Sequence, residues 1–472
     1  MIAVIQRVPA VTLPPLVTVA ASLGVGYALV ERPSLVRVIA AVLVLVALLA
    51  LATVRASTAV VVTLTLLPFL ALGRRMLLDF QSWQATDPLL LVAPLIAIFL
   101  IGKLWLVEWR PLAPDRLSKL VLALFAITVL QSFNPNGGSV VAGVTALLFA
   151  AAPLLWFFVG RDLLDRAAVR RLLALTVPVG AVVALYGLMQ STHGLPSWDA
   201  KWLPRAAAYN ALVVGDRLRS FGTFSSSAEY TTFLALALTT SVACALRRRV
   251  YVLAAMPLLA SALFLGSSRT IVVLTFAAAV VILGASTGNG KLAAVVAIVV
   301  SAAAFAFVHS QGAELATRAA ATDNALITHQ VGGLVDPLDP QQSTMLLHLQ
   351  GIVDGFKFGL SHPLGHGIAS TTLAGGKFGG NVRNVEVDTA DAFVALGLPG
   401  GLVFLAIVLV SLRRATSYAL RSRSLVSLGI LGVLVVTLGQ WSNGGYYAVS
   451  ALVWVLLGVL ARETAPAEEA SG

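Results

Sequence analysis

Charged residues are scarce in this chain of 472 residues. Asp, Glu, Lys and Arg together make up 11% of the sequence, whereas hydrophobic residues make up 58%. Soluble domains carry about 25% charged residues, so the composition excludes a water-soluble globular protein. The sequence therefore predicts a polytopic membrane protein.

Cysteine and histidine are also rare. The single cysteine, Cys244, lies in an apolar run, which excludes an intramolecular disulfide and favours a buried structural thiol. Five of the six histidines fall within 309–391. His362 and His366 have no acidic ligand at helical spacing, so they are weak evidence for a metal site. His366 either approaches a substrate through a loop turn or lies on the surface.

The charge balance is strongly basic, with 32 Lys and Arg against 21 Asp and Glu and a formal net charge of +11. In a soluble protein this excess would suggest a nucleic-acid partner. Here the basic residues cluster in short loops on alternate sides of successive apolar runs, as the positive-inside rule predicts. We therefore expect the lipid bilayer, and not nucleic acid, as a partner. The basic loops near 103–119, 161–171, 247–249 and 413–423 are then cytoplasmic.

The apolar runs predict an all-α bundle of roughly 14 membrane-spanning helices, with about 12 to 14 plausible. The runs begin near Val11, Leu35, Thr58, Pro88, Leu117, Ser139, Leu172, Phe224, Val250, Thr270, Lys291, Ala392, Leu425 and Gly445. Both termini are expected in the cytoplasm, and no cleavable signal peptide is apparent. The chain divides into N-terminal helices (1–190), an external segment with core helices and an arginine site (191–308), a long extracytoplasmic loop (309–391), C-terminal helices (392–462) and a disordered cytoplasmic tail (463–472).

The loop 309–391 is the only long stretch too polar to lie in a bilayer, so we expect it to be partly folded outside the membrane. Helical spacing of apolar residues predicts a helix over 343–360. Its predicted membrane or bundle face consists of Leu349, Ile352, Val353 and Phe356, with Asp354 and Lys357 outward. Gly351 and Gly355 weaken this helix.

The sharpest local signal is RLRSFGTFSSSAEYTTF, which begins at Arg217 and leads into an apolar run. Arg219, and to a lesser degree Arg217, would lie beside a helix N-terminus with free amides, which suits a phosphate or diphosphate. The alternative is that these arginines only snorkel to the membrane surface. Glu229 follows Ser226 by three residues, so it either completes a capping box or acts as a catalytic carboxylate.

Arg269, in GSSRT, lies between two apolar runs on the side that the basic loops assign to the outside. Ionisable residues there are costly and usually paired or functional, so we predict a second diphosphate contact, with snorkelling as the alternative. Packing of the intervening spans would bring Arg219 and Arg269 to one anionic site. The external segment 193–221, with Trp198 and Trp202, is either an interfacial connector or part of a substrate site.

The order of these motifs resembles that of the O-antigen ligase and polymerase superfamily of membrane glycosyltransferases. The resemblance covers about 217–405. It consists of R-x-x-G-T-F (Arg219, Gly222, Thr223, Phe224), S-R (Ser268, Arg269), P-x-G-x-G (Pro363, Gly365, Gly367) and G-L-x-G (Gly397, Leu398, Gly400). It implies that the arginines hold the diphosphate of a polyprenyl-linked glycan and that the long loop helps to form the acceptor site.

Two positions depart from the family pattern. Ser226 and the two residues after it stand where the family often has Asn-Pro-Asn, and the His-Asn of ligase members is replaced by a stretch containing Glu386, Asp388 and Asp391. Asp388 or Asp391 could accept the proton of an acceptor hydroxyl in place of the histidine. The alternatives are a solvated loop acid and a helix cap.

The resemblance implies a metal-independent glycosyltransferase without a cofactor, in the inner membrane of a bacterium, with its active site on the extracytoplasmic side. The expected reaction is polymerisation of polyprenyl-diphosphate-linked oligosaccharide repeat units, with ligation to a lipid or other acceptor as the alternative. Chain-length regulators and other polysaccharide export proteins are candidate partners. The alternative from another class is a flippase or transporter of lipid-linked oligosaccharides.

Overall fold

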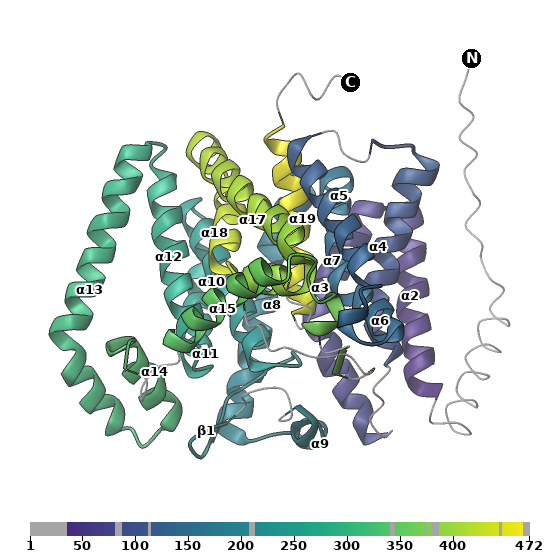
Figure 1. Cartoon of the computed structure of the whole chain (residues 1–472). Coiled ribbons are helices and arrows are strands. Elements are labelled where there is room, and N and C mark those ends of the chain that lie inside the picture. The colour runs from purple at the N-terminus through teal and green to yellow at the C-terminus, as the bar shows by residue number, and fades with distance from the viewer. Residues whose placement is uncertain are drawn as a thin grey trace.

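The computed structural model describes residues 35–80, 87–111, 115–206, 213–339, 345–372, 375–376, 378, 387–442 and 446–465. Within these ranges the chain is almost entirely helical, and its strands are the short antiparallel pair β1 (Val213–Val214) and β2 (Arg217–Leu218). Figure 1 shows the helices gathered in one bundle, as predicted for an all-α membrane protein.

The helices before the strand pair are α2 (Val36–Val54), α3 (Ala56–Met76), η2 (Leu77–Asp79), η3 (Pro88–Leu91), α4 (Val92–Gly102), η4 (Lys103–Val107), α5 (Arg116–Gln131), η5 (Pro135–Gly137), α6 (Val140–Ala150), α7 (Ala152–Leu163), α8 (Arg166–His193) and α9 (Ser197–Ala206). Those after it are α10 (Ser227–Leu246), η6 (Val250–Ala254), α11 (Ala255–Leu265), α12 (Arg269–Ser286), α13 (Gly290–Ala320), α14 (Ala325–Val335), α15 (Met345–Ser361), η7 (Ile368–Ser370), α17 (Asp388–Ser422), α18 (Leu425–Val436) and α19 (Tyr447–Glu463).

In the described part of the chain, nine helices are long and apolar enough to cross a membrane. A helix also begins close to every predicted start from Leu35 to Gly445, including shorter ones such as α18 and α19. The predicted start near Val11 lies outside the described residues. The protein is thus membrane-embedded and helical, while the count of roughly 14 spans stays a prediction.

Small residues set the packing at the centre of the bundle. A Cβ at Gly458 of α19 would lie 1.8 Å from the carbonyl oxygen of Phe157 on α7, and a Cβ at Gly160 would lie 2.1 Å from that of Val455. The two backbones therefore touch through a reciprocal pair of glycines, as in close helix contacts inside membranes. By contrast, α13 stands at the edge of the bundle with Phe305 74% exposed, a surface suited to lipid (Figure 1).

The loops cluster at two opposite ends of the bundle. At one end, which we call the basic end, Arg414 near the end of α17 bonds to Asp115 at the start of α5, at 3.3 Å. At this same end, Arg166 at the start of α8 pairs with Glu463 at the end of α19, at 2.6 Å. We call the opposite end, which contains the starts of α10, α12, α17 and α19, the site end.

A kink in α17 joins two of the motifs noted in the sequence. Gly397 has φ 69° and ψ −168°, which interrupts the helix, and Pro399 has no N–H to donate. The carbonyl of Ala395 consequently lacks its usual helical donor, and Gly367 N supplies one at 2.9 Å. The P-x-G-x-G and G-L-x-G segments are therefore in contact through their backbones.

The same contact continues on either side. His366 N donates to the carbonyl of Val394, and Leu398 N donates to that of Pro363, both at 2.9 Å. A side chain at Gly365 would lie 2.5 Å from Gly397 N, so only glycine allows this approach.

The helix predicted over 343–360 is observed as α15, and it docks on α17. A Cβ at Gly355 would lie 2.5 Å from Ala390, and the rings of Phe356 and Phe393 are 4.6 Å apart. We predicted that Gly355 weakens the helix. In the structure, the absence of a side chain at Gly355 is what allows α15 to approach α17 closely.

The exposure of the side chains on α15 agrees in part with the predicted faces of this helix. Asp354 and Lys357 are exposed, as predicted. Phe356 faces the bundle through its contact with Phe393, whereas Leu349 and Val353 are 46% and 47% exposed, so their placement at the bilayer surface stays a prediction.

Candidate active site at the site end

Two arginines from different parts of the chain converge at the site end. Arg219 lies in the loop between β2 and α10, and its Nε donates to the carbonyl of Gly266 at 3.2 Å. Gly266 follows α11, and Arg269 is the first residue of α12. Both side chains are half-buried. The structure thus brings together the two arginines that were predicted to bind diphosphate.

His329 of α14 holds the second arginine. Its Nε2 lies 2.6 Å from Arg269 Nη2, and its Nδ1 lies 2.8 Å from Ser267 Oγ. Because a guanidinium only donates, Nε2 must accept, and a neutral ring therefore carries its proton on Nδ1. No local sequence pattern indicates this contact, because His329 and Arg269 are sixty positions apart.

Gly333, one turn further along α14, lies against the same guanidinium. A Cβ built there would be 1.8 Å from Nη1 of Arg269. A glycine at this position therefore leaves room for the arginine to lie across the helix surface.

The ionisable groups around Arg219 and Arg269 shift one another's pKa values. Burial lowers the pKa of Arg219, Tyr446 raises it, and Arg269 lowers it. Burial, then Arg269 and then Arg219, lower the pKa of His329 to about 4. At neutral pH the site therefore has two guanidinium charges beside a neutral imidazole. An anion bound between the arginines would offset their repulsion and could use their planar donor sets.

Arg217 is placed differently. It lies on β2 with its side chain 49% exposed, and its Nε is 3.5 Å from Asp216 Oδ2. Its ion pair is therefore with its neighbour in the sequence and not with a group at the arginine pair.

The turn that carries Arg219 is anchored by buried side chains from two other helices. Arg75 of α3 donates from Nη2 to the carbonyl of Gly222 at 2.6 Å and from Nη1 to that of Phe224. Gln190 of α8 accepts from Gly222 N at 2.8 Å. Gly222 has φ 52°, and a Cβ there would lie 2.4 Å from the Tyr230 ring, so the turn requires glycine.

A buried carboxylate completes this anchor. Asp199 of α9 pairs with Arg75 Nε at 2.7 Å and also accepts from Tyr186 Oη at 2.8 Å and from Gln190 Nε2 at 2.7 Å. Both charged side chains are almost fully buried. The external segment 193–221 was noted for its tryptophans, and no local pattern marked Asp199 as the partner of a residue 124 positions away.

The Glu229 side chain caps α19 and not its own helix, α10. Ser226 accepts from Glu229 N at 3.1 Å, so it caps α10 as predicted. The capping box itself is wrong, because the Glu229 carboxylate accepts from Ala448 N at 2.9 Å, at the start of α19. A carboxylate at that end also interacts favourably with the helix dipole.

The two aspartates lie in the first turn of α17. Asp388 is buried and accepts from Ser442 N at 2.7 Å. Asp391, three residues further on, is hydrogen-bonded to the Thr371 side chain, and its buried Oδ1 has no hydrogen-bond partner in the described part of the chain. Val387 occupies the N-cap position. Burial excludes a solvated acid at Asp388, and neither aspartate caps its own helix. Glu386 lies outside the described residues.

Tyr446, just before α19, connects the arginines to the acids. Burial raises its pKa, Glu229 and Asp388 raise it further, and Arg219 lowers it. The hydroxyl is therefore protonated at neutral pH and lies close enough to Arg219, Glu229 and Asp388 to interact with their charged forms. The sequence placed this residue at the start of the apolar run near Gly445 and offered no signal for a role in the site.

His366 belongs to a separate cluster. Its ring is 4.6 Å from that of Phe358 and 5.0 Å from that of His362, and its backbone supports the kink in α17. The structure does not bring it to the arginine pair.

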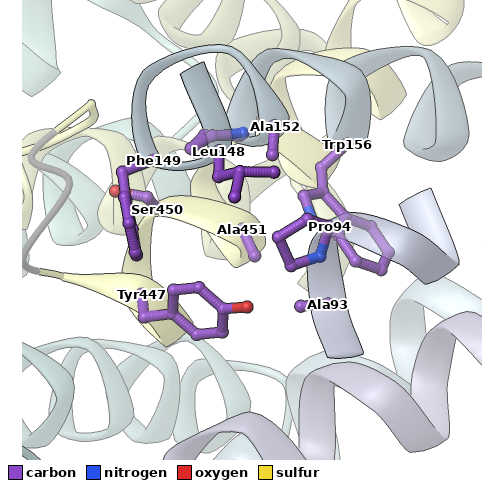
Figure 2. Close-up of a pocket in the computed structure, with 10 residues that line it drawn as sticks. Ala93, Pro94, Leu148, Phe149, Ala152, Trp156, Tyr447, Ser450 and Ala451 are labelled. Atoms are coloured by element: carbon purple, nitrogen blue, oxygen red, sulfur yellow. The ribbon is translucent and has the colours of Figure 1, made fainter. Parts of the chain in front are cut away.

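A small cavity elsewhere in the bundle does not suit a glycan. Figure 2 shows Tyr447, Trp156 and Phe149 around a small space between α4, α6, α7 and α19. The cavity has a volume of about 20 Å³. The Tyr447 hydroxyl donates to the carbonyl of Leu90. A cavity of this size holds about one water molecule, and none of the predicted site residues lines it.

Comparison of the chain with protein-family models and with characterised proteins gives no match. Within the described residues, no group of three or more His, Cys, Asp or Glu side chains gathers as a metal site would require. The expectation of a metal-independent reaction stays a prediction.

Proposed function

We propose that this protein is a membrane glycosyltransferase that uses a polyprenyl-diphosphate-linked oligosaccharide as donor. The observation that carries the proposal is the convergence of Arg219 and Arg269, from either side of two helices, beside a neutral His329. Paired guanidinium groups at the end of a membrane bundle suit a diphosphate whose lipid tail stays in the bilayer.

The proposed reaction uses the two arginines and one acid. An acceptor hydroxyl attacks the anomeric carbon of the donor glycan, the carbon–oxygen bond to the diphosphate breaks, and the diphosphate leaves with the electron pair. Arg219 and Arg269 stabilise the charge that develops on it. The hydroxyl proton passes to a carboxylate. Asp391 is the better candidate, because one of its buried oxygens has no partner among the described residues, whereas Asp388 is engaged by Ser442 N.

We favour polymerisation of repeat units, of the O-antigen or exopolysaccharide type, over ligation to a lipid or other acceptor. Acids stand in this chain where ligase members of the resembling family carry histidine. The proposed setting is the outer face of a bacterial inner membrane, because the basic end then faces the cytoplasm. Chain-length regulators and other polysaccharide export proteins are the proposed partners.

One observation favours a transporter of lipid-linked oligosaccharides. Glu229, Asp388 and Asp391 occupy the first turns of helices long and apolar enough to cross a membrane, and acids at such positions are frequent in transporters. Glu229 is accounted for as the cap of α19, which weakens this alternative without removing it.

Reconstitution of the full chain into vesicles with a defined lipid-linked repeat tests the proposal. A ladder of products supports a polymerase. A single addition to a lipid acceptor would show a ligase. Movement of the intact substrate across the vesicle membrane with no new glycosidic bond would overturn the enzyme proposal in favour of a transporter. Asp391→Asn should abolish the ladder but leave binding of the donor intact.

A further inference from the structure

Four of the six residues that line a pocket at the basic end are arginines. The pocket has a volume of about 280 Å³ and lies between the start of α5 and the last turns of α17. Its lining consists of Arg116, Val410, Arg413, Arg414, Ser417 and Arg421. Figure 1 shows both helix ends on the side opposite α9 and β1.

Helical spacing produces this concentration of charge. Arg413, Ser417 and Arg421 are four residues apart and so lie on one face of α17, above one another. Arg116 reaches the same pocket from α5. The carboxylate of Asp115 pairs with Arg414 at 3.3 Å. It offsets one of the four arginine charges, so the pocket keeps a net positive charge.

We propose that this pocket binds the phosphate group of an anionic phospholipid from the surrounding bilayer. Several arginine forks around a hollow of this size match the oxygens of a phosphodiester. Basic pockets between membrane helices at the cytoplasmic side are a recurrent setting for such head groups.

The surface next to the pocket favours a lipid over free phosphate. Leu409 and Leu402 of α17 are 60% and 52% exposed, and they precede Arg413 by about one and three helical turns. The phosphate pocket therefore continues into an apolar strip on the same helix, which suits acyl chains.

The experiment measures lipid binding to the purified full chain in a neutral detergent by native mass spectrometry. Phosphatidylglycerol is titrated against phosphatidylcholine, with inorganic phosphate as a third ligand. The variant removes two exposed arginines, as Arg413→Gln with Arg421→Gln. The control removes the same charge from exposed positions on α8 at the same end, as Arg170→Gln with Arg171→Gln.

We expect phosphatidylglycerol to bind in preference to phosphatidylcholine and to lose roughly 30-fold in affinity in the pocket variant, since each arginine near a membrane surface contributes about 1 kcal/mol. The control should bind as the wild type does. The pair Arg413→Lys with Arg421→Lys should retain most of the binding because it keeps the charge.

Three results would overturn the proposal. Equal binding of the two lipids would remove the anionic head group as the ligand. Equal weakening in the control would show a general effect of charge. Displacement of phosphatidylglycerol by millimolar inorganic phosphate would assign the pocket to a free anion. Thermal unfolding and gel filtration of each variant verify that the fold is retained.

Discussion

Arginines that pair with a carboxylate at the two ends of the bundle differ in how deeply they are buried. Arg75 at the site end and Arg166 at the basic end each pair with a carboxylate at nearly the same distance, 2.7 Å to Asp199 and 2.6 Å to Glu463. The Arg75 side chain is 1% exposed, whereas that of Arg166 is 71% exposed. Distance alone therefore says little about what an arginine does, because desolvation decides how much its partner matters.

The same contrast separates the two candidate binding places. At the site end, arginines are positioned by backbone carbonyls, a histidine and glycines, which suits a group that must be held in one geometry. At the basic end, the arginines lie around an open pocket, which suits a mobile head group. Four predictions follow this contrast.

The largest effect is expected from breaking the buried pair. Arg75→Met leaves Asp199 buried without its counter-charge and should cost about 3–5 kcal/mol of stability. Arg166→Met at the basic end should cost about 0–1 kcal/mol, because water screens the exposed guanidinium and the buried Glu463 keeps its bonds from Arg462 and Tyr418. The measurement is thermal unfolding of both variants in one detergent.

A double variant sharpens this test. Arg75→Met with Asp199→Leu removes both charges and should be more stable than Arg75→Met alone. Equal losses for Arg75→Met and Arg166→Met would remove the contrast between the ends.

The next largest effect is expected on glycan transfer when either arginine of the site is removed. Arg219→Ala and Arg269→Ala should each reduce glycan transfer roughly 100-fold or more with the fold intact, since each removes a donor to the leaving group. Lysine at either position should restore the rate only in part, because it lacks the bidentate fork. Arg217→Ala should retain most activity, because that side chain lies apart from the pair. Product formation at matched membrane abundance provides the measurement.

Near-normal rates in both Ala variants would contradict the diphosphate site. Arg170→Ala, which changes an exposed arginine of the other end outside both binding places, serves as the control and should leave transfer unchanged.

A smaller effect on glycan transfer is expected from adding a single methyl group at Gly333. Gly333→Ala places a Cβ where Nη1 of Arg269 now lies, and the flexible guanidinium can move aside without unfolding the helix. Displacing it should reduce transfer roughly 10-fold. Gly351→Ala is the matched control, because nothing lies within 4 Å of a Cβ there. A wild-type rate in Gly333→Ala would show that the observed position of Arg269 is not needed.

The smallest effect is a pH dependence. Because its pKa is lowered from 6.5 to about 4, His329 binds fewer protons in the folded state than in the unfolded state between these values. Its contribution to stability is therefore present above about pH 6.5 and is lost as the pH falls toward 4. His329→Gln should lack this component, since its amide can accept from Arg269 and donate to Ser267 without titrating. Identical pH profiles of thermal unfolding for the two proteins would contradict this role.

The sequence alone predicted the parts of the molecule that depend on local chemistry. Apolar runs specified helices from Leu35 onward, because a backbone in lipid must satisfy its own hydrogen bonds. Apolar spacing predicted α15, and a serine at the right place predicted the cap of α10. Arg219 was marked by its place before a helix N-terminus with free amides, and Arg269 by being a lone charge between two apolar runs.

Tertiary structure decided the partners. The contact of His329 with Arg269, the anchor of Asp199 on Arg75 and the reach of Glu229 to α19 join residues at least 60 positions apart. No local pattern encodes such a pairing, because it depends on which helix ends meet once the bundle has packed. Glu229 shows this directly: its spacing from Ser226 fitted a capping box, and packing placed the free amides of another helix within its reach.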